Sequence, residues 1–139
     1  ILYPTDTIWG IGCDATNEEA VRRVYQIKQR SDSKAMLVLV DSPVKVDFYV
    51  QDVPEVAWDL IEVADKPLTI IYSGARNLAS NLIAEDGSVG IRVTNEEFSK
   101  RLNSFVRRLF LRQLISAGNL HRQIIVRSQK NLSPWSTMW

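Results

Sequence analysis

Runs of apolar residues along the first two thirds of the chain alternate with segments in which apolar residues recur at helical spacing. Four segments are predicted to be strands: 1–3, 36–40, 67–72 and 88–93. Three are predicted to be amphipathic helices: 18–29, 54–64 and 95–103. Because strands alternate with helices, the sequence predicts an α/β layered fold. Beyond Phe105 the pattern decays, and no element is predicted there.

The length of 139 residues suits one domain, and no apolar run reaches the ~18 residues of a membrane span. With one cysteine (Cys13) and one histidine (His121), a disulfide framework and a His/Cys metal cluster are excluded. The chain starts at Ile1, without Met and inside an apolar run, so we expect a fragment that lacks its first residues. No signal peptide is recognisable, and we expect a cytoplasmic protein.

Charge is unevenly distributed, although the net charge is only +1. All 16 acidic residues lie between Asp6 and Glu97, whereas residues 106–139 contain six Lys and Arg and no acid. Such asymmetry is typical of a basic arm that binds nucleic acid, or else indicates a tail that is not a natural protein sequence.

The densest group of polar side chains follows the first predicted strand, in the segment Tyr3–Gly12. Thr5, Asp6 and Thr7 supply two hydroxyls and a carboxylate, and the glycines that follow let backbone approach a ligand. Ligands bind at strand ends in open α/β sheets. The alternative is a polar turn with no ligand.

Cations gather where the first helix is predicted to end. Lys28 and Arg30, with Lys34 close behind, could hold phosphate groups. The arginine could do so through two parallel hydrogen bonds. Alternatively, they only complement the negative end of the helix dipole.

The predicted strand 88–93 carries Ser88, Gly90 and Arg92 on one face. Such a strand suits a carboxylate-binding arginine in an amino-acid or nucleotide site, and the alternative is an edge strand with a surface arginine. Because no histidine lies nearby in sequence, we expect Cys13 to be structural rather than a nucleophile. Trp9 and Trp58 are expected in the core or in a pocket wall.

Together these segments resemble the threonylcarbamoyl-AMP synthase family, also called the YrdC-like domain. The matching stretches are YPTDTIWGIGCDATNEEAV, KQR (a KxR motif), KPLTIIY and DGSVGIRVTNEEF. The resemblance implies a twisted open mixed sheet flanked by helices around a positively lined cavity, with the C-terminal part incomplete. The YrdC-like domain would span residues 1–108.

The resemblance also implies a reaction and a set of site residues. The family condenses L-threonine, bicarbonate and ATP into threonylcarbamoyl-AMP and pyrophosphate, and a downstream threonylcarbamoyl transferase then modifies tRNA. Thr7 and Arg92 would bind L-threonine. Lys28 and Arg30 would be catalytic and hold the ATP phosphates, bridged by Mg²⁺, with Lys34 beside them and Ser88 at the nucleotide.

The resemblance fails after Arg108, where the family has a second ATP motif, SxN, and this chain does not. We therefore expect residues 109–139 to be an atypical basic tail, read one base out of register. Shifting the codons of Ser136–Trp139 by one base can give Val-Asp-Tyr-Val, and the same offset over 111–120 can restore most of an SxN segment. The alternative is a divergent or engineered C-terminus. A copy without this motif is expected to bind ATP weakly and to be impaired.

Two other functions remain open. The chain could be a non-catalytic module that binds tRNA or double-stranded RNA through Arg107, Arg108 and Arg112. It could also belong to the carbamoyl-AMP chemistry of hydrogenase maturation, although it has no acylphosphatase-like or zinc-finger sequence to support that reading.

Overall fold

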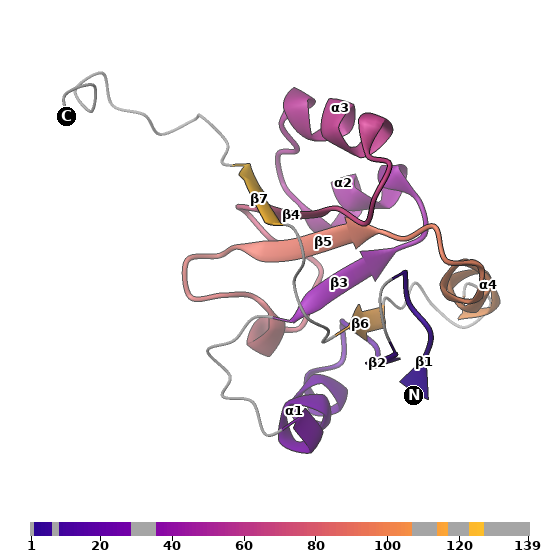
Figure 1. Ribbon diagram of the computed structural model, residues 1–139. Coiled ribbons are helices and arrows are strands. Elements are labelled where there is room, and N and C mark those ends of the chain that lie inside the picture. The colour runs from indigo at the N-terminus through magenta and orange to yellow at the C-terminus, as the bar shows by residue number, and fades with distance from the viewer. Residues whose placement is uncertain (1, 7–8, 29–35, 107–113, 117–122, 127–139) are drawn as a thin grey trace.

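The computed structural model describes residues 2–6, 9–28, 36–106, 114–116 and 123–126 (Figure 1). A short two-stranded ribbon pairs β1 (Leu2–Tyr3) with β2 (Gly10–Ile11) in antiparallel fashion. The ribbon is half-buried, because Tyr3 is fully buried while Leu2 is exposed. The predicted strand at 1–3 is therefore confirmed over its described residues, but only one of its faces reaches the core.

Within the described residues, the main sheet has five strands in the order β6-β3-β5-β4-β7. Their bounds are β3 (Leu37–Val40), β4 (Thr69–Tyr72), β5 (Val89–Val93), β6 (Leu114–Ser116) and β7 (Gln123–Val126). β3 runs parallel to β5 and β4 parallel to β7, whereas β3–β6 and β4–β5 are antiparallel. The prediction of a mixed sheet flanked by helices is confirmed.

In the part of the chain that the structure describes, four α-helices accompany the sheet: α1 (Glu18–Lys28), α2 (Val46–Tyr49), α3 (Glu55–Val63) and α4 (Glu97–Val106). Two short 3₁₀ helices, η1 (Pro43–Lys45) and η2 (Ser80–Leu82), lie in the connections. In Figure 1, α2 and α3 are at the top of the view and α1 is at the bottom, and residues of all three helices join the same core. None of these helices has the length and apolar character needed to cross a bilayer.

The two faces of the sheet carry different side chains. Val38, Val40, Ile70, Tyr72 and Ile91 point to one face and join residues of α1, α2 and α3 in the main core. The register places Leu37 beside Gly90 and Leu39 beside Arg92, and alternation puts these four residues and Thr69 on the opposite face. We call that opposite face, defined by Leu37, Leu39, Thr69, Gly90 and Arg92, the Arg92 face.

The strand at 36–40 was predicted to be buried on both faces, and all four residues of β3 are buried. Of the two tryptophans expected in the core or a pocket wall, Trp58 packs partly buried against the core. Trp9, however, is 66% exposed and does not line the cavity described below, so that expectation is wrong. Trp9 precedes a ribbon of only two residue pairs, which is too short to cover an indole ring.

Candidate functional site

The polar loop after β1 is fixed to the distant end of β5. Thr94 Oγ1 donates a hydrogen bond to Asp6 Oδ2 at 2.6 Å, and the Asn95 backbone N–H donates to Asp6 Oδ1 at 3.0 Å. Ser99 Oγ also donates to the Pro4 carbonyl oxygen at 3.3 Å. Two of the polar clusters recognised in the sequence, the PTDT segment and the strand that carries Arg92, therefore meet in space.

A second carboxylate shapes the same corner, where β5 passes into α4. Glu96 accepts hydrogen bonds from the backbone N–H groups of Phe98 (3.0 Å) and Ser99 (2.6 Å), so its side chain caps the helix. Burial acts to raise the pKa of Glu96, but these hydrogen bonds outweigh it and leave the pKa below its usual value. The corner is therefore held together by two carboxylates that accept hydrogen bonds from the end of β5 and from the first turn of α4.

Arg92 is the one charged side chain among the described residues that is buried, with 4% exposure. Its Nε and Nη2 atoms donate to Thr69 Oγ1 at 3.0 and 2.8 Å, and Thr69 is itself 1% exposed. No carboxylate in the described part of the chain forms an ion pair with Arg92. Burial lowers the pKa of Arg92, and the nearby charge of Asp6 partly opposes that shift.

This arrangement suits the binding of an anion. A guanidinium has five N–H donors, and Thr69 takes up two of them with a neutral oxygen. A desolvated cation without a contacting counter-ion gains strongly when a carboxylate or phosphate approaches its remaining donors. The Arg92 face is therefore the candidate functional site.

Gly90 is the small residue beside Arg92 on this face. A Cβ atom at this position would lie 3.5 Å from Thr69 Cγ2 and 3.9 Å from Leu37 Cδ1, which are ordinary van der Waals contacts, so these two side chains pack close to the glycine.

Ser88, the other predicted residue on this strand, lies at its opposite end. Its backbone N–H donates to Asp86 Oδ1 at 3.0 Å in the turn that leads into β5. Four residues of extended chain separate its Cα from that of Arg92 by about 13 Å. One small anion cannot reach both residues, whereas an amino acid joined to a nucleotide could.

The structure tests only part of the predicted site. Lys28 is half-buried at the end of α1, Ser88 directly precedes β5, and Arg92 lies on β5. Thr7, Arg30 and Lys34 fall outside the described residues. The convergence of Thr7, Arg30 and Arg92 around one cavity therefore stays a prediction, supported so far by the contact of Asp6, next to Thr7, with the end of β5.

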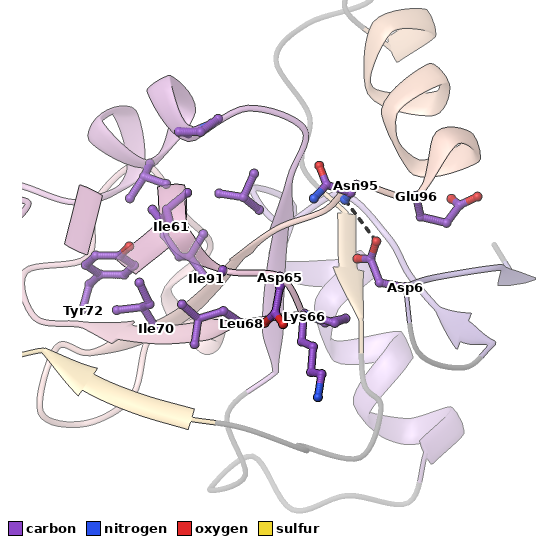
Figure 2. Close-up of a pocket in the computed structure, with 15 residues that line it drawn as sticks. Asp6, Ile61, Asp65, Lys66, Leu68, Ile70, Tyr72, Ile91, Asn95 and Glu96 are labelled. Atoms are coloured by element: carbon purple, nitrogen blue, oxygen red, sulfur yellow. Dashed lines mark hydrogen bonds between the residues drawn. The ribbon is translucent and has the colours of Figure 1, made fainter. Parts of the chain in front are cut away.

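A cavity of about 510 Å³ lies on the other face of the sheet, beside α3 (Figure 2). Figure 2 shows Ile70, Tyr72 and Ile91 at one end of it and Asp6, Asn95 and Glu96 at the other. Lys28, Ser88 and Arg92 are not among its lining residues. The carboxylates of Asp6 and Glu96, which line this cavity, accept hydrogen bonds from backbone and hydroxyl donors.

Cys13 behaves as a structural residue. Its thiol is partly buried, and burial together with the neighbouring Asp14 raises its pKa to about 11. A thiol with such a pKa is almost entirely protonated at neutral pH and is a poor nucleophile. In the part of the chain that the structure describes, no group of three or more His, Cys, Asp or Glu side chains could hold a metal ion.

Sequence reasoning did not single out Thr69 or Thr94, the partners of Arg92 and Asp6. The available signal for Thr69 was a hydroxyl in the otherwise apolar segment LTIIY. Thr94 follows directly after the predicted strand 88–93, where a polar residue marks only the strand end.

Comparison with known proteins places the chain in a family. The family model Sua5_yciO_yrdC, described as "Telomere recombination", matches residues 1–133. A threonylcarbamoyl-AMP synthase of Stutzerimonas stutzeri is 33% identical over 103 residues, 73% of this chain and 56% of that protein. One of Pseudoalteromonas translucida is 33% identical over 105 residues, with the same coverage of both chains. The chain thus spans about half the length of the curated relatives it matches.

Solved structures share the fold at lower sequence identity. P. abyssi Sua5 complexed with L-threonine superposes with a TM-score of 0.75 at 21% identity, over 84% of this chain and 33% of that one. E. coli YciO superposes with a TM-score of 0.69 at 22% identity, over 83% of this chain and 55% of that one. Since the family model covers nearly the whole sequence, the chain belongs to the Sua5/YciO/YrdC family.

Proposed function

We propose that this chain carries the substrate-binding sheet of an L-threonylcarbamoyladenylate synthase. Such an enzyme condenses L-threonine, bicarbonate and ATP into threonylcarbamoyl-AMP and pyrophosphate. Support comes from the relatives named threonylcarbamoyl-AMP synthase and from the L-threonine complex of a protein with the same fold. The observation that carries the proposal is Arg92, a buried cation whose contacting partner among the described residues is a neutral hydroxyl.

In this proposal, Arg92 binds the carboxylate of L-threonine and Thr7 contacts the same substrate. The carboxylate supplies the counter-ion that the desolvated guanidinium lacks. Asp6 ties the segment that carries Thr7 to the end of β5, which keeps the two proposed threonine contacts near each other.

ATP would lie toward the other proposed residues. Lys28 and Arg30, with Lys34 beside them, would hold the phosphates, and Ser88 would contact the nucleotide. The separation of about 13 Å between Ser88 and Arg92 matches a product in which an amino acid is joined to a nucleotide. Mg²⁺ would arrive with the phosphates of ATP, which is how this ion commonly enters nucleotide sites.

The chemistry requires positioning and charge neutralisation rather than a covalent enzyme intermediate. The amine of threonine attacks bicarbonate or CO₂ to give an N-carboxylate, and this carboxylate attacks the α-phosphorus of ATP while pyrophosphate leaves. Lys28 and Arg30 would be the catalytic residues, because they would stabilise the charge that develops on the phosphates. Threonylcarbamoyl-AMP would then pass to a downstream transferase that modifies tRNA, in the cytoplasm.

We expect this copy to be impaired as a synthase. The SxN motif that would grip the nucleotide from its other side is missing from the sequence, so ATP should bind weakly. The domain of residues 1–108 and the out-of-register tail of residues 109–139 stay predictions, to be decided by sequencing the source DNA. An in-frame SxN segment in that DNA would contradict them.

Binding of L-threonine tests the proposal without requiring turnover. Calorimetric titration should show that L-threonine binds the wild-type chain and that Arg92→Met abolishes binding. Arg101→Met is the matched control, because Arg101 is exposed and pairs with Glu97 on the surface of α4. If the wild-type chain does not bind L-threonine, or if both variants bind alike, the proposal is wrong.

The alternative is an RNA-binding module, favoured by the basic, acid-free composition of residues 106–139. Its signature would be affinity for tRNA or double-stranded RNA that falls steeply with salt and depends on Arg107, Arg108 and Arg112. Affinity for RNA that these three arginines do not affect would count against it.

A further inference from the structure

Thr69 and Arg92 form a buried pair across the two central antiparallel strands. The register pairs Ile70 with Ile91, so Thr69 lies opposite Arg92 on the neighbouring strand. Both side chains are more than nine-tenths buried. One hydroxyl oxygen accepts hydrogen bonds from two nitrogens of the same guanidinium, at 3.0 and 2.8 Å.

The position of these hydrogen bonds determines which donors remain for a ligand. A guanidinium can hold a carboxylate along its side, through Nε and Nη2, or at its end, through Nη1 and Nη2. Thr69 occupies the side edge. Three of the five N–H groups remain, two on Nη1 and one on Nη2, and both of these nitrogens lie at the end of the side chain.

The rotamer of Thr69 is itself constrained. Its Oγ1 faces Arg92, while its Cγ2 lies 3.5 Å from the position that a Cβ of residue 90 would take. That is an ordinary van der Waals distance, and a β-branched side chain is stiff about χ1. The stiff threonine side chain therefore fixes the direction in which the guanidinium points.

We infer that Thr69 is a positioning residue that holds Arg92 so that a ligand carboxylate is bound end-on by Nη1 and Nη2. The identification of that ligand as L-threonine rests on the proposed function. Thr69 itself does not touch the ligand. Its loss leaves Arg92 in place but free to rotate, which weakens recognition of the carboxylate more than that of the rest of the amino acid.

Three variants test this inference in the full chain. Thr69→Val keeps the shape and removes the acceptor, Thr69→Ser keeps the acceptor, and Thr16→Val makes the same replacement at an exposed turn. Thr69→Val should weaken L-threonine binding roughly tenfold or more. It should change the binding of L-threoninamide, which lacks the carboxylate, by less than twofold.

Thr69→Ser should bind L-threonine within about threefold of the wild type, and Thr16→Val should be unchanged. A merely structural role of Thr69 would weaken both ligands equally and would not be rescued by serine. Equal losses for both ligands, or undiminished threonine binding by Thr69→Val, would overturn the inference. Should Thr69→Val fail to fold, Thr69→Ala replaces it with the same expectation.

An NMR measurement separates this inference from the proposed function. The Nε–H signal of Arg92, assigned by its disappearance in Arg92→Lys, should exchange slowly in the wild type and rapidly in Thr69→Val. If the wild type shows this protection but does not bind L-threonine, the proposed function fails while the positioning by Thr69 stands. Rapid exchange in the wild type refutes the positioning itself.

Discussion

Replacing Asp6 by Ala should destabilise the fold, because Asp6 holds the N-terminal loop against a corner 88 residues away. The carboxylate accepts one hydrogen bond from Thr94, which is fully buried, and one from the exposed backbone of Asn95. Hydrogen bonds to charged groups contribute about 1.5–3 kcal/mol, and less where water can replace the acceptor. We assign about 2 kcal/mol to the Thr94 bond and about 1 kcal/mol to the Asn95 bond, or about 3 kcal/mol in all.

Urea unfolding followed by tryptophan fluorescence measures this loss. With a urea dependence of about 1.5 kcal/mol per M, the midpoint of Asp6→Ala should fall by about 2 M. Asp6→Asn retains one acceptor oxygen and should lose about half as much. Asp65→Asn is the control, since Asp65 lines the same cavity but is exposed, and it should shift the midpoint very little. Equal shifts for Asp6→Ala and Asp65→Asn would refute this account of the corner.

Two further predictions follow from shifted pKa values. Burial raises the pKa of Cys13, the one cysteine of the chain, from 9.0 to about 11. At pH 8 this thiol should therefore react with iodoacetamide roughly a hundredfold more slowly in the folded than in the urea-unfolded protein. Equal rates would show that folding does not suppress the thiolate. Glu96 has a lowered pKa, so its contribution to stability is present above pH 4.5 and is lost as the pH falls below that value. Between pH 6 and pH 3, the melting temperature of Glu96→Gln should therefore fall less steeply than that of the wild type. Equal slopes would contradict the capping role. Glu62→Gln, on an exposed face of α3, serves as the control.

The sequence predicted the long elements well, because their signals are local. The helix expected at 18–29 is described as α1, Glu18–Lys28, and the one expected at 54–64 is α3, Glu55–Val63. The third helix begins at Glu97 rather than Asn95, since the side chain of Glu96 caps it. Its first turn is capped through local hydrogen bonds to Glu96, which the sequence alone did not distinguish from a start at Asn95.

Short elements were missed because they have too few residues to show a period. The four residues of α2 make about one turn, and β2 has only two residues. β6 and β7 lie in the region where no element was predicted, and each pairs with an edge of a sheet whose other strands come from much earlier in the chain. Their pairing depends on neighbours that a local pattern cannot reveal.

The site was predictable only in part, because some of its contacts join residues that are far apart in the sequence. Alternation along one strand sufficed to put Gly90 and Arg92 on one face. It could not show that Arg92 is buried, or that its partner is Thr69, 23 residues earlier. The expected alternative of a surface arginine on an edge strand is wrong, because β5 lies between β3 and β4.

The burial of Arg92 has a consequence for stability as well as for binding. Placing a guanidinium on a covered sheet face costs solvation free energy, and a hydroxyl returns only part of it. An apolar side chain at that position would stabilise the fold more than a charged one. The buried charge therefore indicates a ligand that supplies the missing counter-ion. The nearest acid, Asp6, has its carboxylate engaged by Thr94 and Asn95, which keeps it from neutralising Arg92 by direct contact. The same hydrogen bonds that fix the loop thus leave the cation available to an incoming carboxylate.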